Sequence, residues 1–544
     1  MGAEPVDADV DADADADADQ DADRFALRLR GGWLARWKSR PPPTYWLTRF
    51  AFLRWLAFIY LVAFASLATQ LGPLIGSHGI LPAAWFVDDL RRIEGSRLSA
   101  FVDLPSIFWL TGVSDAVMVA MCWIGLALSI AALAGVTNAI VQALLWFLYM
   151  SFVHIGQVWY GYGWEMLLLE AGFLSIFLCP LRTATPFPPA KAPPVAVVWM
   201  LRWVVFRLMV GAALIKLRGD SCWRDLTCLQ YHYETQPNPS PLSWLIHQAP
   251  PWFHSIGVLF NHFVELVVPF FAFGPRRVRH VAGVLLVLFQ VLLILSGNLS
   301  FLNWLTIGVC IACFDDQLLG KLATARRRAR IAELEAGAAE RATRVERGVI
   351  YGLAAVVLSL SPFPVTNMIS SRQLMNASFD PLHLVNTYGA FGSVDRVRHE
   401  VILEGTSDRV LGPHTRWKEY ELPCKPGDVR RAPCFITPWH FRLDWQMWFA
   451  ALPGAGYDTE PWIVRLVDQL LSGNREVARL FARDPFPRRP PRFIRAQLYR
   501  YEFTRLGDRS DAWWKRRFVT EYLRPLSRGD PELRAFLDAH GWLR

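Results

Sequence analysis

Residues 207–244 read RLMVGAALIKLRGDSCWRDLTCLQYHYETQPNPSPLSW. An apolar helix that carries Arg207 and Lys216 leads here into a segment dense in polar side chains, among them Asp220, His232 and Glu234. Charges at membrane depth are energetically costly, so each is expected to face a partner or a polar cavity. This junction between an apolar helix and a polar loop is therefore the first place to expect a functional site.

The composition is typical of a membrane protein. Of 544 residues, 53% are hydrophobic, and the chain contains 24 Trp and 35 Phe; the mean hydropathy is +0.21. Together with the long apolar runs, these values predict a polytopic α-helical membrane protein. The net charge of +9 comes from short basic clusters, which in a membrane protein act as orientation signals rather than as a nucleic-acid surface. We expect membrane lipid as a partner and no nucleic acid.

Nine apolar segments are candidates for membrane spans, although the last two are short for the ~20 residues that a span requires. Basic clusters in residues 182–191, 275–280 and 321–347 alternate with mixed or nearly neutral loops. With nine spans this obeys the positive-inside rule, which predicts a cytoplasmic N-terminus and an external or lumenal C-terminal region. The segments are Trp46–Thr69, Val113–Val136, Ile140–Ile155, Trp164–Cys179, Val195–Ile215, Ile256–Phe273, Val281–Ser296, Phe301–Phe314 and Gly348–Leu360.

Composition divides the chain into three parts. Residues 1–43 form an acidic Asp-Ala tail, predicted to be disordered, and a basic juxtamembrane stretch. Residues 44–362 form the multi-helix transmembrane domain. Residues 363–544 hold no apolar run long enough to span, and we predict an extramembrane α+β domain. Its alternating stretches 399–407, 416–428 and 493–503 are typical of strands, and 439–452 and 460–473 of amphipathic helices.

Several charged residues fall within the predicted spans. The simplest interpretation is mutual pairing inside the bundle, for instance of Glu170 with an arginine of the fifth span. The alternative is a polar cavity that admits a substrate. The residues are Arg49, Arg54, Glu165, Glu170, Arg202, Arg207 and Glu265.

Lys216 has two interpretations. A lysine at the end of a membrane helix commonly extends its amine to the surface and has no other role. A desolvated lysine, by contrast, can serve as a general base, and Asp220, His232 and Glu234 lie close by in the sequence. The chain contains no Ser-His-Asp order, Walker loop, dinucleotide-binding glycine pattern or metal-ligand set, so we expect no cofactor and no metal.

Four of the eight cysteines fall in regions predicted to be external. Cys222 and Cys228 are separated by five residues, and Cys424 and Cys434 flank a segment with a Pro-Gly turn. An oxidising compartment permits disulfides, and both spacings allow one. We predict the pairs Cys222–Cys228 and Cys424–Cys434.

Over residues 44–450 the chain resembles the lipase maturation factor family. The resemblance is carried by long stretches, which include LTRFAFLRWLAFIYLVAF (47–64), HIGQVWYGYGWEMLLLEAGFLSIFLCP (154–180), LIKLRGDSCWRDLTCLQYHYETQPNPSPLSW (214–244) and ELPCKPGDVRRAPCFITPWHFRLDWQMWF (421–449). It implies a multi-pass protein, in animals of the endoplasmic reticulum, whose lumenal C-terminal domain helps secreted lipases to fold and assemble. The richness in Ala, Arg and Pro is typical of a GC-rich bacterial genome, which favours a bacterial plasma membrane here.

A more distant resemblance links the transmembrane half to the vitamin K-dependent γ-carboxylase group and its membrane relatives, the HTTM group. It rests on GAALIKLRGDSCW (211–223). In this resemblance Lys216 matches the base lysine of the carboxylase and Trp223 the tryptophan that follows it.

Two functions are therefore compared. The first is a non-enzymatic membrane maturation factor whose outer domain binds partly folded secreted clients. The family resemblance implies that these clients include lipases. The second is an integral membrane enzyme with an outer-leaflet pocket around Lys216, assisted by Asp220, His232 or Glu234. The family resemblance favours the first.

Overall fold

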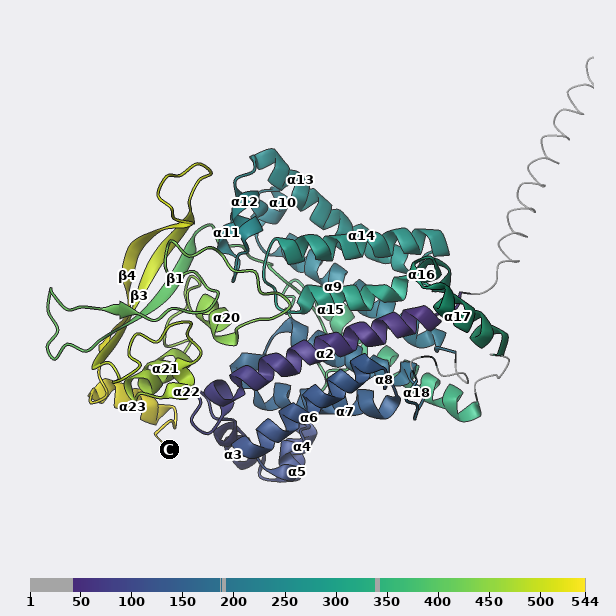
Figure 1. The fold of residues 1–544 in the computed structure, drawn as a ribbon, viewed down its shortest axis with the longest axis horizontal. Helices are drawn as coiled ribbons and strands as arrows, with labels where there is room; N and C mark the ends of the chain where they lie inside the picture. Colours follow the sequence, from purple (N-terminus) through teal and green to yellow (C-terminus); the bar gives the residue numbers. More distant parts are fainter. Residues whose placement is uncertain (1–42, 186, 188–191, 338–342, 544) are drawn as a thin grey trace, which may run out of the picture. The chain divides into compact units, whose positions relative to one another are not determined.

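The computed structural model describes residues 43–185, 187, 192–337 and 343–543. The predicted disordered tail lies outside the described residues. Tyr45–Arg544 form one compact unit that combines membrane helices with a small antiparallel sheet (Figure 1).

Among the described residues, six helical segments are long and apolar enough to cross a membrane. Three shorter helices, α7 (Ala139–Ile155), α8 (Gly163–Leu178) and α15 with its 3₁₀ extension η4 (Leu302–Cys313), account for the other predicted segments. All nine predicted segments are thus helical, and six have the length of a full span. The long segments are α2 (Trp46–Ile75), α6 (Asp115–Ala134), α9 (Val195–Arg218), α13 with η2 and η3 (Pro251–Phe273), α14 (Arg276–Leu295), and α18 with α19 (Arg344–Ile369).

The ninth segment differs from its prediction. We expected a short helix at Gly348–Leu360, but α18 (Arg344–Leu360) and α19 (Pro362–Ile369) together span 26 residues. Pro362 does not interrupt the segment because it sits in the first turn of α19, where the missing N–H is not needed. The helical segment therefore continues beyond the residue at which the composition changes.

Short helices outside these segments complete the helical region. Polar caps fix several helix starts, such as Ser114 before α6 and Asn138 before α7, whose side chains accept a backbone N–H of the first turn. The remaining helices are α3 (Ala83–Glu94), α4 (Arg97–Asp103), α5 (Phe108–Thr111), η1 (Gln157–Tyr160), α10 (Ser221–Arg224), α11 (Leu229–Thr235), α12 (Pro241–His247), α16 (Asp316–Leu322) and α17 (Ala325–Gly337).

Hydrogen bonds bring the starts of α2 and α14 together beside the end of α15 and η4. The backbone N–H of Trp46, at the start of α2, donates to Asp316 at 2.8 Å, just after α15 and η4 end. Arg276, at the start of α14, donates to the adjacent Asp315 at 2.8 Å. Figure 1 shows α16 and α17 at the end of the bundle away from the sheet. The basic clusters of residues 275–280 and 321–337 therefore share one end.

The sheet contains four antiparallel strands in the order β2-β1-β3-β4. Strands were predicted in three places: β1 (Arg398–Thr406) and β3 (Phe493–Phe503) confirm two, with Val401 opposite Leu498. The third stretch, 416–428, forms only the two-residue strand β2 (Lys418–Glu419). The edge strand β4 (Trp514–Leu526) was not predicted. The helices α20 (Arg442–Phe449), α21 (Trp462–Leu471), α22 (Arg475–Ala478) and α23 (Pro531–Ala539) complete this region.

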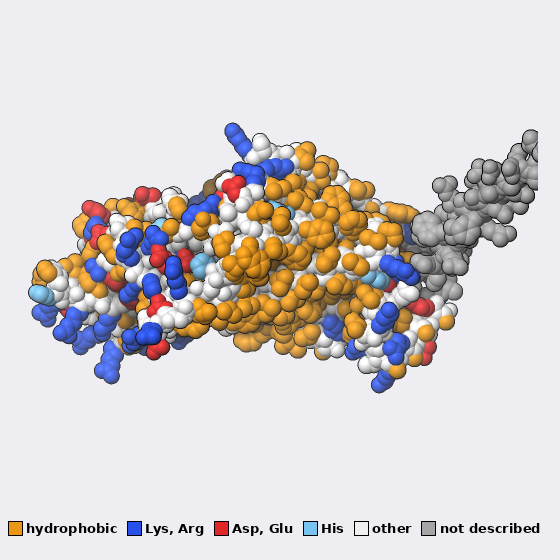
Figure 2. All heavy atoms as spheres, turned by 90° about the horizontal axis from the view of Figure 1, so that it is seen from above, with side chains coloured by type: hydrophobic (Ala, Val, Ile, Leu, Met, Phe, Trp, Pro, Cys, Tyr) orange, Lys and Arg blue, Asp and Glu red, His pale blue; other side chains and the backbone are white. Residues whose placement is uncertain are grey.

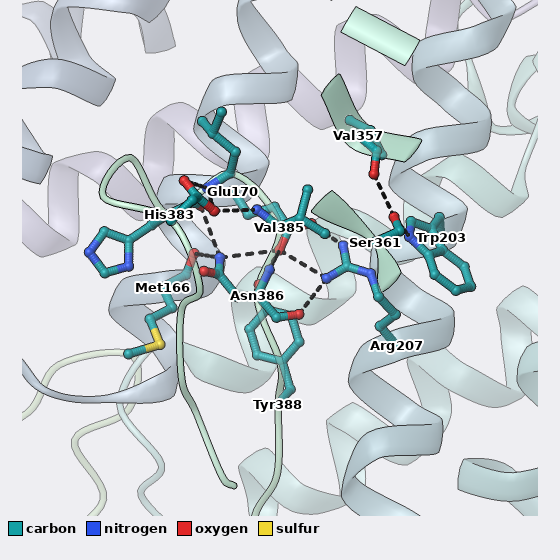
Figure 3. Close-up of polar contacts among 12 residues, drawn as sticks. Met166, Glu170, Trp203, Arg207, Val357, Ser361, His383, Val385, Asn386 and Tyr388 are labelled. Atoms are coloured by element: carbon teal, nitrogen blue, oxygen red, sulfur yellow. Dashed lines mark hydrogen bonds and ion pairs between the residues drawn. The ribbon is translucent and has the colours of Figure 1, made fainter. Parts of the chain in front are cut away.

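A buried ionic cluster joins the helices to the segment that leads into the sheet (Figure 3). Glu170 of α8 forms an ion pair with Arg207 of α9, and both side chains are at most 2% exposed. Glu170 also accepts the backbone N–H of Asn386 at 3.1 Å and the hydroxyl of Tyr388 at 2.7 Å. Arg207 in turn donates to the carbonyl of Asn386. Because these donors surround it, the carboxylate is compensated although it is buried.

The backbone approaches α9 closely beside this cluster. A Cβ at Gly211 would lie 2.6 Å from the carbonyl oxygen of Tyr388, which is closer than non-bonded atoms allow. Glycine is therefore required for the segment around Tyr388 to lie against α9.

A second ionic contact fixes α20 to the bundle. Arg442 donates to Glu165 of α8 at 2.8 Å and to the carbonyl of Trp159 at 2.5 Å, and the two charged side chains have no exposed surface. The backbone N–H of Arg442 also donates to Gln70 of α2 at 2.8 Å. The sheet region is thus attached to both α2 and α8.

We predict that Glu170→Gln destabilises the chain strongly. Glutamine cannot neutralise Arg207, and leaving one partner of a buried ion pair uncompensated costs about 3–5 kcal/mol. Thermal unfolding of the full chain in detergent measures the effect.

Glu333→Gln is the matched control, because the Arg330–Glu333 pair (2.9 Å) has side chains that are 46% and 65% exposed. The change there should be no more than about 0.5 kcal/mol. Equal melting temperatures for the two variants would contradict a structural role of the Glu170 cluster.

Candidate functional site

A cavity of about 260 Å³ lies among the membrane helices on the side of the bundle that faces the polar loop. Apolar side chains of α9, α13, α14 and α15 form most of its wall, and the loop helices α11 and α12 also contribute residues. Its polar groups include Lys216, His232, Asn261, Glu265, Gln290 and Asn303. An amphipathic enclosure of this kind is the usual form of a small-molecule site.

Lys216 forms the centre of the polar wall. Its amine contacts both carboxylate oxygens of Glu265, at 2.6 and 2.8 Å, and donates to Asn261 at 3.2 Å. Asn261 also donates to Glu265 at 2.9 Å, and the amine lies 5.1 Å from the centre of the Trp223 ring. Lys216 and Glu265 are only 4% exposed, so the amine does not extend to the surface.

The helix that carries Glu265 is irregular where this residue lies. The α-helix α13 (Pro251–His262) passes into one π-helical turn, η2 (Phe263–Val267), and then into the 3₁₀ helix η3 (Val268–Phe273), which contains Pro269. A single π turn inside a membrane helix often marks a functional position. It holds Glu265 toward α9, where it meets Lys216.

His232 is the second predicted site residue in the cavity wall. Its ring packs against Phe391, with centroids 4.6 Å apart. Burial, with a smaller contribution from nearby Lys216, lowers the pKa of His232 to about 4. The imidazole is therefore neutral near pH 7, with one nitrogen able to donate and one to accept.

Asp220 and Glu234 serve other contacts. Arg396 pairs with Asp220 at 2.8 Å, and this hydrogen bonding lowers the pKa of Asp220 to about 2. Glu234 accepts the backbone N–H of Phe503 at 2.7 Å, while burial raises the pKa of its carboxyl. Neither residue lines the cavity. Of the four predicted catalytic residues, the structure therefore brings together only Lys216 and His232.

The structure contains both predicted disulfides among its described residues. Cys222–Cys228, in the polar loop, has a Cα separation of 4.7 Å and lies beside Trp223. Cys424–Cys434, in the C-terminal region, has a Cα separation of 5.4 Å. The cysteines Cys122, Cys179, Cys310 and Cys313 are free thiols.

The remaining intramembrane charges contact backbone carbonyls, carboxylates or aromatic rings. Glu170 pairs with an arginine of the fifth span, as expected, and that arginine is Arg207. Arg54 donates to the carbonyl of Ala132 at 2.8 Å. Arg202 donates to the carbonyl of Ala312 and to the hydroxyl of Tyr45, each at 2.9 Å, and Arg49 lies 5.0 Å from the ring of Trp46.

Sequence reasoning missed Asn261, the third member of the Lys216 group. A signal existed, because Asn261 is a polar residue in an apolar span, four positions before Glu265. It also missed Arg442, the partner of Glu165, for which no local pattern gave a signal.

A larger depression of about 870 Å³ lies beside β2 and β4. Charges of both signs line it, among them the pair Arg516–Glu419 at 2.6 Å, and it contains none of the predicted catalytic residues. We therefore place the candidate site in the cavity around Lys216.

Comparison with known proteins identifies two family domains. The family model for the lipase maturation factor transmembrane domain matches residues 47–321, and that for the lipase maturation factor C-terminal domain matches residues 384–524. No solved structure matches the chain.

Similar proteins extend over nearly the whole chain. Lipase maturation factor 1 of Bos taurus is 48% identical over 519 residues, which cover 92% of each protein. Lipase maturation factor 1 of Homo sapiens is 45% identical over 519 residues, covering 92% of this chain and 91% of the relative. Lipase maturation factor 2 of Homo sapiens is 32% identical over 614 residues, covering 91% and 85%.

A multi-pass helical region that carries a small antiparallel sheet domain agrees with these matches. The chain therefore belongs to the lipase maturation factor family.

Proposed function

We propose that this chain is a membrane-anchored factor that assists the folding or assembly of secreted client proteins through its C-terminal region. The names of its relatives indicate lipases as the client class. The observation that carries the proposal is the free edge of strand β4.

Strand β4 is the longest strand of the sheet and lies at its edge. It pairs with β3, and the part of the chain that the structure describes supplies no strand on its other side. Residues 515–521 are exposed, including Phe518 (52%) and Val519 (44%). An exposed edge of this kind binds an extended segment by backbone hydrogen bonds, and a partly folded client offers such segments.

The charges of β4 select among partners. Lys515, Arg516 and Arg517 are consecutive on the strand. Cationic edges disfavour pairing between identical copies, so the same feature that limits self-association leaves the edge available to a different chain.

We further propose that the sheet faces the outside of the cell or the lumen. The basic clusters of residues 275–280 and 321–337 lie at the opposite end of the bundle (Figure 1), where the positive-inside rule places the cytoplasm. Both disulfides lie outside the long apolar helices, on the side of the sheet, and disulfides persist in oxidising compartments.

The edge is tested by combining Phe518→Ser with Val519→Ser. Both residues are exposed, so stability should change by no more than about 1 kcal/mol for the pair, whereas client maturation should fall several-fold. The measurement is the activity of a lipase secreted by cells that lack their own maturation factors and express the variant.

The matched control is Val410→Ser with Leu411→Ser. These residues are 82% and 37% exposed and lie in the loop between β1 and β2. Secretion should remain unchanged in this control, and equal secretion with both double variants would exclude the β4 edge as the client site.

One observation favours the enzyme as a second candidate function. The buried amine of Lys216 borders a partly open cavity, as a base acting on a membrane-derived substrate would. Two observations argue against the enzyme. The amine of Lys216 already donates hydrogen bonds to Glu265 and Asn261. Asp220 and Glu234, which were predicted to assist it, do not line the cavity.

Lys216→Arg separates the two functions. Arginine keeps the charge and pairs with a carboxylate, but it does not lose a proton near neutral pH. We expect lipase maturation to be retained in Lys216→Arg and lost in Lys216→Met, because the latter leaves Glu265 buried without a cation, at about 3–5 kcal/mol. A folded but inactive Lys216→Arg variant would instead establish the enzyme.

A further inference from the structure

The cavity around Lys216 opens toward the bilayer. Phe253 of α13 and Leu292 and Leu295 of α14 line it, yet they are 45%, 44% and 42% exposed. Figure 1 shows α13 and α14 diverging toward the sheet, and Figure 2 shows that hydrophobic side chains predominate on the surface of the bundle on this side. A molecule dissolved in the membrane can therefore enter between these two helices without crossing water.

The charge of the cavity wall excludes some occupants. Lys216 and Glu265 neutralise each other at 2.6 Å, so the polar wall has no net charge from this pair. An anionic head group would meet the carboxylate of Glu265 together with the amine of Lys216, so it would lose its hydration without any net attraction from the pair. A neutral head group that both donates and accepts hydrogen bonds meets no such penalty.

His232 supplies an available hydrogen-bonding group. It lines the cavity, is 8% exposed, and its ring makes no hydrogen bond to any part of the chain that the structure describes. The imidazole can therefore donate to or accept from a ligand hydroxyl placed beside it in the cavity.

The volume limits the size of the occupant. The cavity of about 260 Å³ is slightly smaller than most ligand sites, which measure about 300–1,000 Å³. It suits a head group and the beginning of one acyl chain, with the rest of the chain between α13 and α14. A two-chain phospholipid would exceed it.

We propose that this cavity binds a neutral single-chain lipid of the monoacylglycerol type, whose hydroxyl groups contact His232, Asn261 and Glu265. The acyl chain extends past Leu292 into the bilayer. The site is distinct from the β4 edge, and its test measures binding alone, so it does not depend on the proposed client function.

The full chain in lipid nanodiscs is tested with two photoreactive probes, monooleoylglycerol and oleate, each with a diazirine and an alkyne in the acyl chain. The monooleoylglycerol probe should label peptides of α13 and α14 and do so more strongly than the oleate probe. Leu292→Trp fills the opening and should reduce this labelling about tenfold, which corresponds to about 1.4 kcal/mol.

Leu288→Trp is the matched control. Leu288 lies one turn earlier on α14 with a similar exposure of 45%, but it does not line the cavity. Labelling should be unchanged in this variant. Equal labelling of the two tryptophan variants, or stronger labelling of the unsubstituted chain by oleate, would overturn the proposal.

A charge variant tests the head-group preference separately. Glu265→Gln leaves Lys216 as an uncompensated cation, so the preference should shift from the neutral probe toward oleate. Unchanged preference in a folded variant would contradict the role of the ion pair. If this variant does not fold, the comparison of Leu292→Trp with Leu288→Trp decides.

Discussion

The carboxylate of Glu170 is the group on which the arrangement of the chain depends. It is buried among membrane helices, where an isolated charge would be highly unfavourable, and four groups compensate it: the guanidinium of Arg207, the backbone and side-chain amides of Asn386, and the hydroxyl of Tyr388. Two of these residues belong to the segment that leads to β1. These contacts therefore join the placement of the sheet to the packing of the bundle.

The same principle recurs along the boundary between helices and sheet. Glu165 receives Arg442 of α20. Glu400 of β1 pairs with Arg398 and Lys425. Arg398 also donates to the carbonyl of Glu234 near the end of α11 and to those of Gln236 and Pro237, which follow it. Such pairs contribute less to stability than to specificity, because a misplaced segment leaves a charge buried alone. The polar loop after Lys216 is thus held between the cavity and the sheet.

Sequence patterns predicted those parts of the structure that depend on local composition. Apolar runs located all nine helical segments, since helices in lipid or in a bundle must be hydrophobic, and alternation located β1 and β3. Strand β4 was missed because its exposed residues do not alternate: Lys515, Arg516 and Arg517 are followed by Phe518 and Val519. Sequence patterns could not identify most partners of the buried charges. Glu170 and Asn386, for example, are 216 residues apart, and only the folded chain brings them together.

The central claim is that helices and sheet form one cooperative unit through buried ionic contacts. Hydrogen–deuterium exchange of the full chain in nanodiscs, followed under increasing denaturant, tests it most directly. The account predicts that the amides of Val401–Leu403 in β1 and those around Glu170 in α8 lose protection in a single transition. Exchange of β1 in an earlier, separate transition, while α8 remains protected, would contradict it.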